Sequence, residues 1–99
     1  MALSVLVRTY TGEILARSVH RAHGQLCSSA RKEGLPLLAD VDPYDDTIFN
    51  SLQVKRLAAE LESLRQSVST PEDEAISEVV ELIELVLVKP HRYLVFNGD

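Results

Sequence analysis

Two amphipathic helical patterns in the second half of the 99-residue chain limit most strongly what it can fold into. The first predicts a helix over Ser51–Gln66, where Asn50 or Ser51 can cap the first turn and Gln53 stands at the position of a capping box. Its apolar stripe recurs at helical spacing and consists of Leu57, Leu61, Leu64 and Val68. Two charged pairs are expected on its solvent side, and these are Arg56 with Glu60 and Glu62 with Arg65.

The second helix is predicted from Thr70 to about Val88. Thr70 is expected to cap it, Pro71 suits a first-turn position that needs no N–H, and three acids follow where the helix dipole favours them. Pro90 ends the pattern. The predicted core face consists of Ile76, Val79, Val80, Ile83, Val86 and Leu87. A helix pair cannot bury both apolar faces by itself, so a second layer is required.

The remaining apolar segments predict strands. Leu3–Tyr10 and Ile14–Val19, joined through Gly12, predict a β-hairpin, and Arg92–Phe96 predicts a closing strand. Leu6 falls on the opposite face from its apolar neighbours, which predicts that something also covers part of that face. The predicted fold is a single α+β domain over residues 1–99. It is a two-layer sandwich in which an antiparallel helix pair covers a three-stranded antiparallel sheet, in the order ββααβ.

The segment between the hairpin and the helix pair carries weaker signals. A short helix over Gln25–Glu33, ended by Gly34, is one interpretation. Leu35–Leu38 is expected to be an extended strap on the core, because Pro36 disfavours helix at the residue before it. A zinc site would need a helix through Gly24 to bring together the possible ligands His20, His23 and Cys27. The polar composition favours a connector instead, so no metal site is predicted.

Composition narrows the functional classes. A single cysteine cannot form an internal disulfide, which fits a reducing compartment. The N-terminus lacks the basic region of a secretion signal, and no apolar stretch approaches the roughly 18 residues of a membrane span, so a cytoplasmic protein is predicted. No phosphate-binding loop, G-x-S-x-G or H-E-x-x-H motif is present. No catalytic residue and no cofactor are therefore predicted.

Charge is distributed unevenly along the chain. Residues 1–39 carry five Arg and Lys against two Glu, a net charge of +3, whereas residues 40–99 carry five against thirteen acids, a net charge of −8. An acidic surface repels phosphates, so neither nucleic acid nor a membrane is a predicted partner. Either the two halves neutralise each other within the fold or the acidic half faces a basic protein.

The segment Leu37–Ser51 concentrates acidic residues around a proline, and the acids are Asp40, Asp42, Asp45 and Asp46. Their carboxylates could bind a cation, but the spacing does not match an EF-hand. Turn formation is the preferred interpretation, in which the side chains bond local backbone N–H groups. A partner-binding surface is the alternative, for which an exposed Tyr44 would be typical. Otherwise Tyr44 and Phe49 would pin the loop to the core.

The second predicted helix also carries an acidic stripe opposite its core face. Glu74, Glu78 and Glu81 form it, and no Lys or Arg on this helix offsets them. Leu85 lies within the stripe, and an apolar residue ringed by carboxylates is typical of an interface that faces a basic partner. Leu85 could instead be covered by the strap or by the last strand. A homodimer that uses a second apolar flank is a third possibility.

The run P-L-L-A-D-V-D-P-Y-D-D-T-I-F-N-S-L-Q, from Pro36 to Gln53, resembles a segment of small uncharacterised bacterial proteins that share a V-D-P-Y-x-D-T-x-F-N core. The resemblance covers under a fifth of the chain, implies a bacterial origin and carries no activity.

The sequence thus predicts a small acidic protein-binding module that masks a basic partner, as an immunity protein masks a secreted toxin or nuclease. The predicted partner-binding residues are Asp42, Tyr44, Asp45, Asp46, Glu74, Glu78, Glu81 and Leu85. A homo-oligomeric structural or accessory protein is the second hypothesis, and a metal-dependent enzyme is the third.

Overall fold

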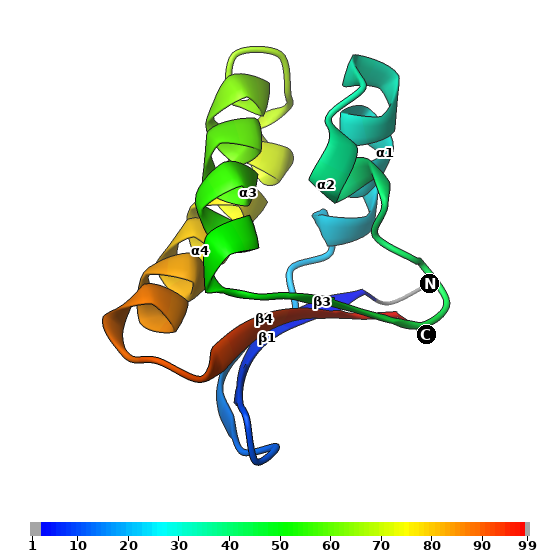
Figure 1. The fold of residues 1–99 in the computed structure, drawn as a ribbon. Helices are drawn as coiled ribbons and strands as arrows, with labels where there is room; N and C mark the ends of the chain where they lie inside the picture. Colours follow the sequence, from blue (N-terminus) through cyan, green and yellow to red (C-terminus); the bar gives the residue numbers. More distant parts are fainter. Residues whose placement is uncertain (1–2, 99) are drawn as a thin grey trace.

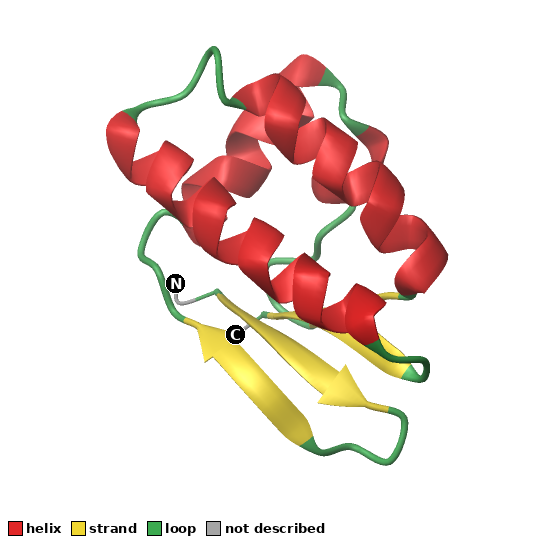
Figure 2. Cartoon of the chain, turned by 90° about the vertical axis from the view of Figure 1, so that its left-hand side faces the viewer, coloured by secondary structure: helices red, strands yellow, loops and turns green. Residues whose placement is uncertain are grey.

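The computed structural model describes residues 3–98, in which all the helices pack on one face of an antiparallel sheet (Figures 1 and 2). The elements follow in the order β1 (Ser4–Thr9), β2 (Ile14–Ser18), α1 (His23–Glu33), α2 (Pro36–Ala39), β3 (Asp46–Phe49), α3 (Ser51–Leu64), α4 (Thr70–Val88) and β4 (Arg92–Asn97). This architecture confirms the α+β class, but the predicted order ββααβ was wrong, because α1, α2 and β3 lie between the hairpin and the long helices. None of the helices within residues 3–98 is long and apolar enough to cross a bilayer.

The sheet of the described residues has four strands in the order β2-β1-β4-β3, so the prediction of three strands was wrong. The hairpin of β1 and β2 forms with Gly12 at a φ of +100°, and β4 pairs with β1 as expected. The unpredicted strand is β3, which adds to the free edge of β4. It has only four residues at the end of the acidic segment, too few to show an alternating pattern of their own.

Helix α1 forms as predicted but begins two residues earlier, at His23, and therefore runs through Gly24. The expectation of a polar connector here was wrong, because His23, Leu26, Cys27 and Ala30 form a buried side on this helix. Gly34 ends α1 in the left-handed conformation, and its N–H bonds the free carbonyls of the last turn.

The segment after Gly34 is not an extended strap. Leu35 is extended, as the residue before a proline should be, but Pro36–Ala39 forms the short helix α2. Glu60 of α3 is buried rather than solvent-exposed, and its carboxylate accepts hydrogen bonds from the backbone N–H groups of Leu37 and Leu38, both at 3.0 Å. A tertiary contact thus supplies the cap that the local sequence lacks, and the predicted surface pair of Arg56 with Glu60 does not form.

The long helices α3 and α4 form a pair over the sheet. The capping box of Asn50 and Gln53 is present, and Glu62 pairs with Arg65 at 3.2 Å, both as predicted. The N-cap of α4 is Ser69 rather than Thr70, and its side chain makes no capping bond. Its hydroxyl instead donates to Glu72, which is buried in the first turn of α4.

The core lies between the sheet and the helix layer. Phe49 and Phe96 meet edge to face with ring centroids 5.8 Å apart, which links β3 to β4 on the core side. Most of the predicted core face of α4 is buried, but Leu87 is exposed and Val80 only half-buried. Leu82 and Ala75 take their place, because the buried arc of α4 is rotated about the helix axis relative to the prediction.

Candidate functional site

The acidic segment is held mainly by local hydrogen bonds. Asp42 Oδ1 accepts from the N–H of Tyr44 at 2.8 Å, and Asp45 Oδ1 accepts from the N–H of Asp46 at 2.8 Å. Thr47 Oγ1 accepts from the N–H of Asp42 at 2.9 Å, and Asp46 Oδ1 accepts from Asn97 Nδ2 at 2.6 Å. This geometry agrees with the preferred turn interpretation, because Asp42, Asp45 and Asp46 each use one carboxylate oxygen to accept a hydrogen bond within the fold.

The two aromatic side chains of this segment lie in opposite environments. Phe49 is buried against Phe96, so it pins the end of the segment to the core. Tyr44 is 75% exposed and does not pin the loop. The sequence indicates that an exposed Tyr44 would be typical of an interface residue, and the side chain is exposed.

The acidic stripe of α4 divides into engaged and free members. Glu74 Oε1 lies 3.4 Å from His20 Nε2, and Glu78 Oε1 accepts a hydrogen bond from Ser18 Oγ at 2.5 Å. Glu81 is exposed, as is Glu84, and no ion pair within residues 3–98 includes either of them. The structure thus removes Glu78 from the open surface and adds Glu84, which the sequence did not single out.

Apolar side chains continue this surface toward the end of α4. Leu85 is 38% exposed and Val88 is 69% exposed, so neither the strap position nor β4 covers Leu85 fully. Arg92 Nη1 donates to the carbonyl oxygen of Leu85 at 2.8 Å, which satisfies one free carbonyl of the last turn. We name the exposed side chains opposite the core the α4 surface, which consists of Glu74, Glu81, Glu84, Leu85 and Val88.

The acidic segment and the α4 surface lie at different places on the sheet. The acidic segment leads into β3, where Asp46 pairs with Asn97 at the end of β4. Helix α4 instead crosses from β2, where Glu78 contacts Ser18, to the start of β4, where Arg92 contacts Leu85. Strands β2 and β3 are the two outer strands, separated by about 14 Å at the usual strand spacing. The predicted partner-binding residues therefore form two separate surfaces rather than one.

A buried polar network that no sequence pattern predicts connects β2, α1 and α4. Ser18 Oγ lies 2.7 Å from His23 Nε2 and donates its proton to Glu78. Because the hydroxyl proton is used in this way, His23 must donate from Nε2, which leaves Nδ1 as an unprotonated acceptor. This Nδ1 is buried and has no hydrogen-bond partner within residues 3–98. Burial lowers the pKa of His23 to about 4, although the Glu78 carboxylate acts in the opposite direction.

This network contains the residue types of a catalytic triad in the wrong arrangement. In a triad the histidine accepts the serine proton and the acid holds the other ring nitrogen. Here the Glu78 carboxylate accepts directly from Ser18 Oγ, His23 Nε2 donates to that serine oxygen, and Ser18 is only 7% exposed. His23 donates to Ser18 and so cannot take its proton, and the serine hydroxyl is nearly buried, so the network joins three elements without presenting a nucleophile.

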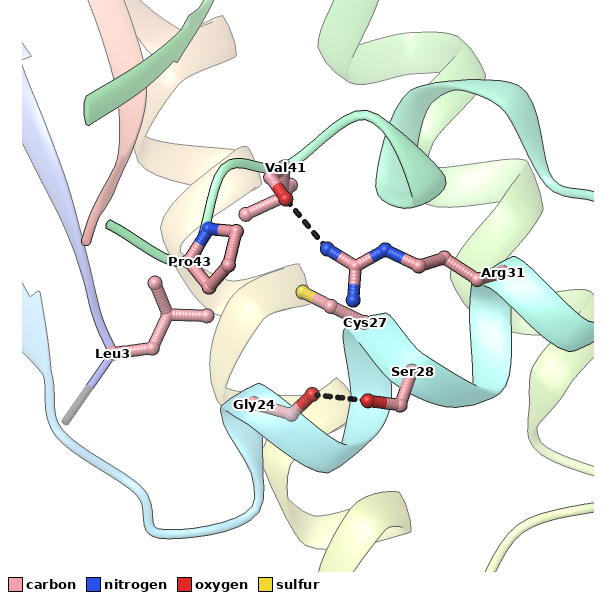
Figure 3. Close-up of a pocket in the computed structure, with 7 residues that line it drawn as sticks. All are labelled: Leu3, Gly24, Cys27, Ser28, Arg31, Val41 and Pro43. Carbon is pink, nitrogen blue, oxygen red and sulfur yellow. Dashed lines mark hydrogen bonds between the residues drawn. The ribbon is translucent and has the colours of Figure 1, made fainter. Parts of the chain in front are cut away.

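The cysteine of α1 borders a small cavity of about 80 Å³ beside the acidic segment (Figure 3). Burial raises the pKa of the Cys27 thiol to about 11, so it stays protonated at neutral pH. The Arg31 guanidinium at the cavity donates to the carbonyl oxygens of Ala39 and Val41. The thiol is therefore a poor nucleophile at neutral pH, and two of the three guanidinium nitrogens of Arg31 are engaged by the backbone.

The zinc-ligand arrangement weighed from the sequence does not form. His20 precedes α1, and its Nδ1 accepts from the N–H of Ala22 at 3.0 Å, while His23 Nε2 is held by Ser18. Across residues 3–98, no group of three or more His, Cys, Asp or Glu side chains is placed to hold a metal ion. The acidic segment is included in that finding.

No protein-family model, curated protein or solved structure matches the chain. The arrangement of its own side chains is therefore the basis for a functional proposal.

Proposed function

We propose that the chain is a protein-binding module that uses the α4 surface to bind a basic partner, in the manner of an immunity protein that masks its target. The observation that carries the proposal is the pair of free carboxylates, Glu81 and Glu84, beside the exposed apolar side chains of Leu85 and Val88. A partner of this kind presents Lys or Arg around an apolar patch.

The two kinds of side chain have different tasks in such a complex. Glu81 and Glu84 attract a cationic partner over a distance of about one Debye length, which raises the rate of association. Leu85 and Val88 then exclude water at the centre of the contact, where apolar anchors slow dissociation. Helix α4 is suited to present them, because its opposite side is buried along its length against the sheet and α3.

The acidic segment plays a smaller part in this proposal than the sequence predicted. Asp42, Asp45 and Asp46 each use one carboxylate oxygen in a hydrogen bond within the fold, and the segment leads into β3, apart from the α4 surface. Tyr44 remains a candidate anchor for a second contact, which a large partner could reach. Glu78 is assigned to the buried network with Ser18 rather than to binding.

The test is affinity capture from a lysate of the source cells, carried out at about 50 mM and about 500 mM salt. A basic protein should be retained at low salt and released at high salt. The double variant Glu81→Lys with Glu84→Lys should weaken capture about ten-fold or more, because it reverses the steering charges. The matched control is Glu13→Lys with Glu33→Lys, which changes the net charge equally at exposed positions away from α4 and should retain the partner. Equal capture by both double variants would refute the assignment of the α4 surface.

A further inference from the structure

The sheet has a second face that none of the helices in residues 3–98 covers (Figures 1 and 2). The strand register places one residue from each strand in a row across this face, and the row consists of Ile48, Val95, Leu6 and Arg17. The next row contains Tyr93, Arg8 and Ile14. We name these seven residues the open sheet face.

The open sheet face carries several apolar side chains, as a surface that binds a partner does. The centres of strands β1 and β4 are continuous apolar runs, residues 5–7 and 93–96, a pattern typical of strands buried on both faces. Leu6 and Val95 are buried but lie outside the core cluster, whereas Ile48 and Ile14 are each 49% exposed. Arg8, Ile48 and Tyr93 also line a shallow hollow together with Tyr10.

The open sheet face is also positively charged. Neither Arg8 nor Arg17 takes part in an ion pair within residues 3–98. The nearest strand residue with a carboxylate is Asp46, at one end of β3, and it is already hydrogen-bonded to Asn97. An occupant of this face must therefore combine apolar side chains with carboxylates of its own.

The chain itself carries a surface of that composition. The α4 surface presents three carboxylates beside Leu85 and Val88, and it belongs to the helix layer, which lies on the other face of the sheet (Figure 2). We propose that the open sheet face of one copy binds the α4 surface of a second copy, so that the copies associate head to tail. This inference rests on the proposed function, because it uses the same surface of α4 and names a further partner for it.

Charge favours this arrangement over a two-fold dimer. Packing two open sheet faces against each other would bring four unpaired arginines, Arg8 and Arg17 from each copy, into one interface. Stacking α4 on the sheet places carboxylates opposite them and covers the exposed parts of Ile14 and Ile48 with a second helical layer. Such a contact joins two different surfaces, so it leaves one of each free and adds further copies rather than closing at two.

The test measures mass against concentration by light scattering at about 50 mM salt, with two charge-reversal variants. The wild-type chain should show a mass that rises progressively with concentration. Arg17→Glu and Glu81→Arg should each raise the apparent dissociation constant about ten-fold, because each places like charges across the contact. The controls, Lys32→Glu and Glu33→Arg, carry the same charge changes on α1 and should associate as the wild type does. Thermal unfolding verifies that all four variants are folded.

An equimolar mixture of Arg17→Glu and Glu81→Arg should recover association. In the mixture, the reversed sheet face meets the reversed helix, and the native face of one variant meets the native helix of the other. A wild-type mass that stays at one copy at all concentrations, or that stops at two, would overturn head-to-tail association. So would association that both reversals leave unchanged. A strictly monomeric chain that still captures a basic protein through Glu81 would overturn this inference while the proposed function stands.

Discussion

Acidification from about pH 7 to about pH 5 is expected to destabilise the fold through His23. The ring of His23 is fully buried, with one nitrogen donating to Ser18 and the other without a partner. Protonation would place a positive charge in this site, and burial lowers the pKa of His23 from 6.5 to about 4. In the unfolded chain the same ring is exposed to water and titrates near its ordinary value.

The sign and size of the effect follow from these two values. Between pH 6.5 and pH 4 the unfolded chain binds a proton that the folded chain does not, so the free energy of unfolding falls as the pH falls. Integrating the proton uptake of this one group gives a loss of about 2 kcal/mol between pH 7 and pH 5. That amount is a large fraction of the 5–15 kcal/mol, roughly, by which small domains are stable.

The measurement is urea unfolding followed by circular dichroism at several pH values in this range. In His23→Gln the amide can still donate to Ser18 but does not titrate, so the curve should be flatter by about 2 kcal/mol. The control is His91→Asn, which removes an exposed histidine at a positive φ that asparagine tolerates, and which should retain the wild-type slope. Parallel curves for the wild type and His23→Gln would refute the reasoning.

Three further predictions concern other contacts. Glu60→Gln should lower the free energy of unfolding by about 1–3 kcal/mol, because the glutamine side chain can accept only one of the two hydrogen bonds from the N–H groups of α2. The control Glu62→Gln, on the exposed side of α3, should change the free energy of unfolding by less than about 0.5 kcal/mol in the same urea assay. The Cys27 thiol should react with iodoacetamide at neutral pH only as the chain unfolds, so rapid alkylation in native buffer would contradict its buried, protonated state. Gly98→Ala should destabilise the chain and loosen the acidic segment, because a Cβ would lie 2.5 Å from the backbone of Asp45; unchanged hydrogen exchange at the N–H of Asp46 would argue against this.

The parts of the fold that were predictable from the sequence are those whose signals are local. The capping box of Asn50 and Gln53 and the glycine stop at Gly34 depend on residues a few positions apart. The apolar period of α4 likewise located its buried side, although the prediction placed Leu87 within the core when it lies at the margin.

The features that escaped prediction depend on residues far apart in the chain. Strand β3 exists because β4 offers a free edge to four residues that carry no strand pattern of their own. Helix α2 forms after Pro36 because Glu60 reaches its first N–H groups from another helix. Similarly, the sequence places Glu78 in an exposed acidic stripe, but in the fold it accepts a hydrogen bond from Ser18, which lies sixty positions earlier in the chain.

The sequence by itself determined the class of the protein, the two long helices, the hairpin and the concentration of acid in the second half. Those properties follow from periodicity, capping and composition, which act over a few residues. The tertiary structure alone decided which charged side chains remain unpaired. A carboxylate is hydrogen-bonded or free according to which residues the packing places beside it. It separated the acidic segment from α4, engaged Glu78, left Glu81 and Glu84 in solvent, and exposed an arginine-bearing sheet face on the other side.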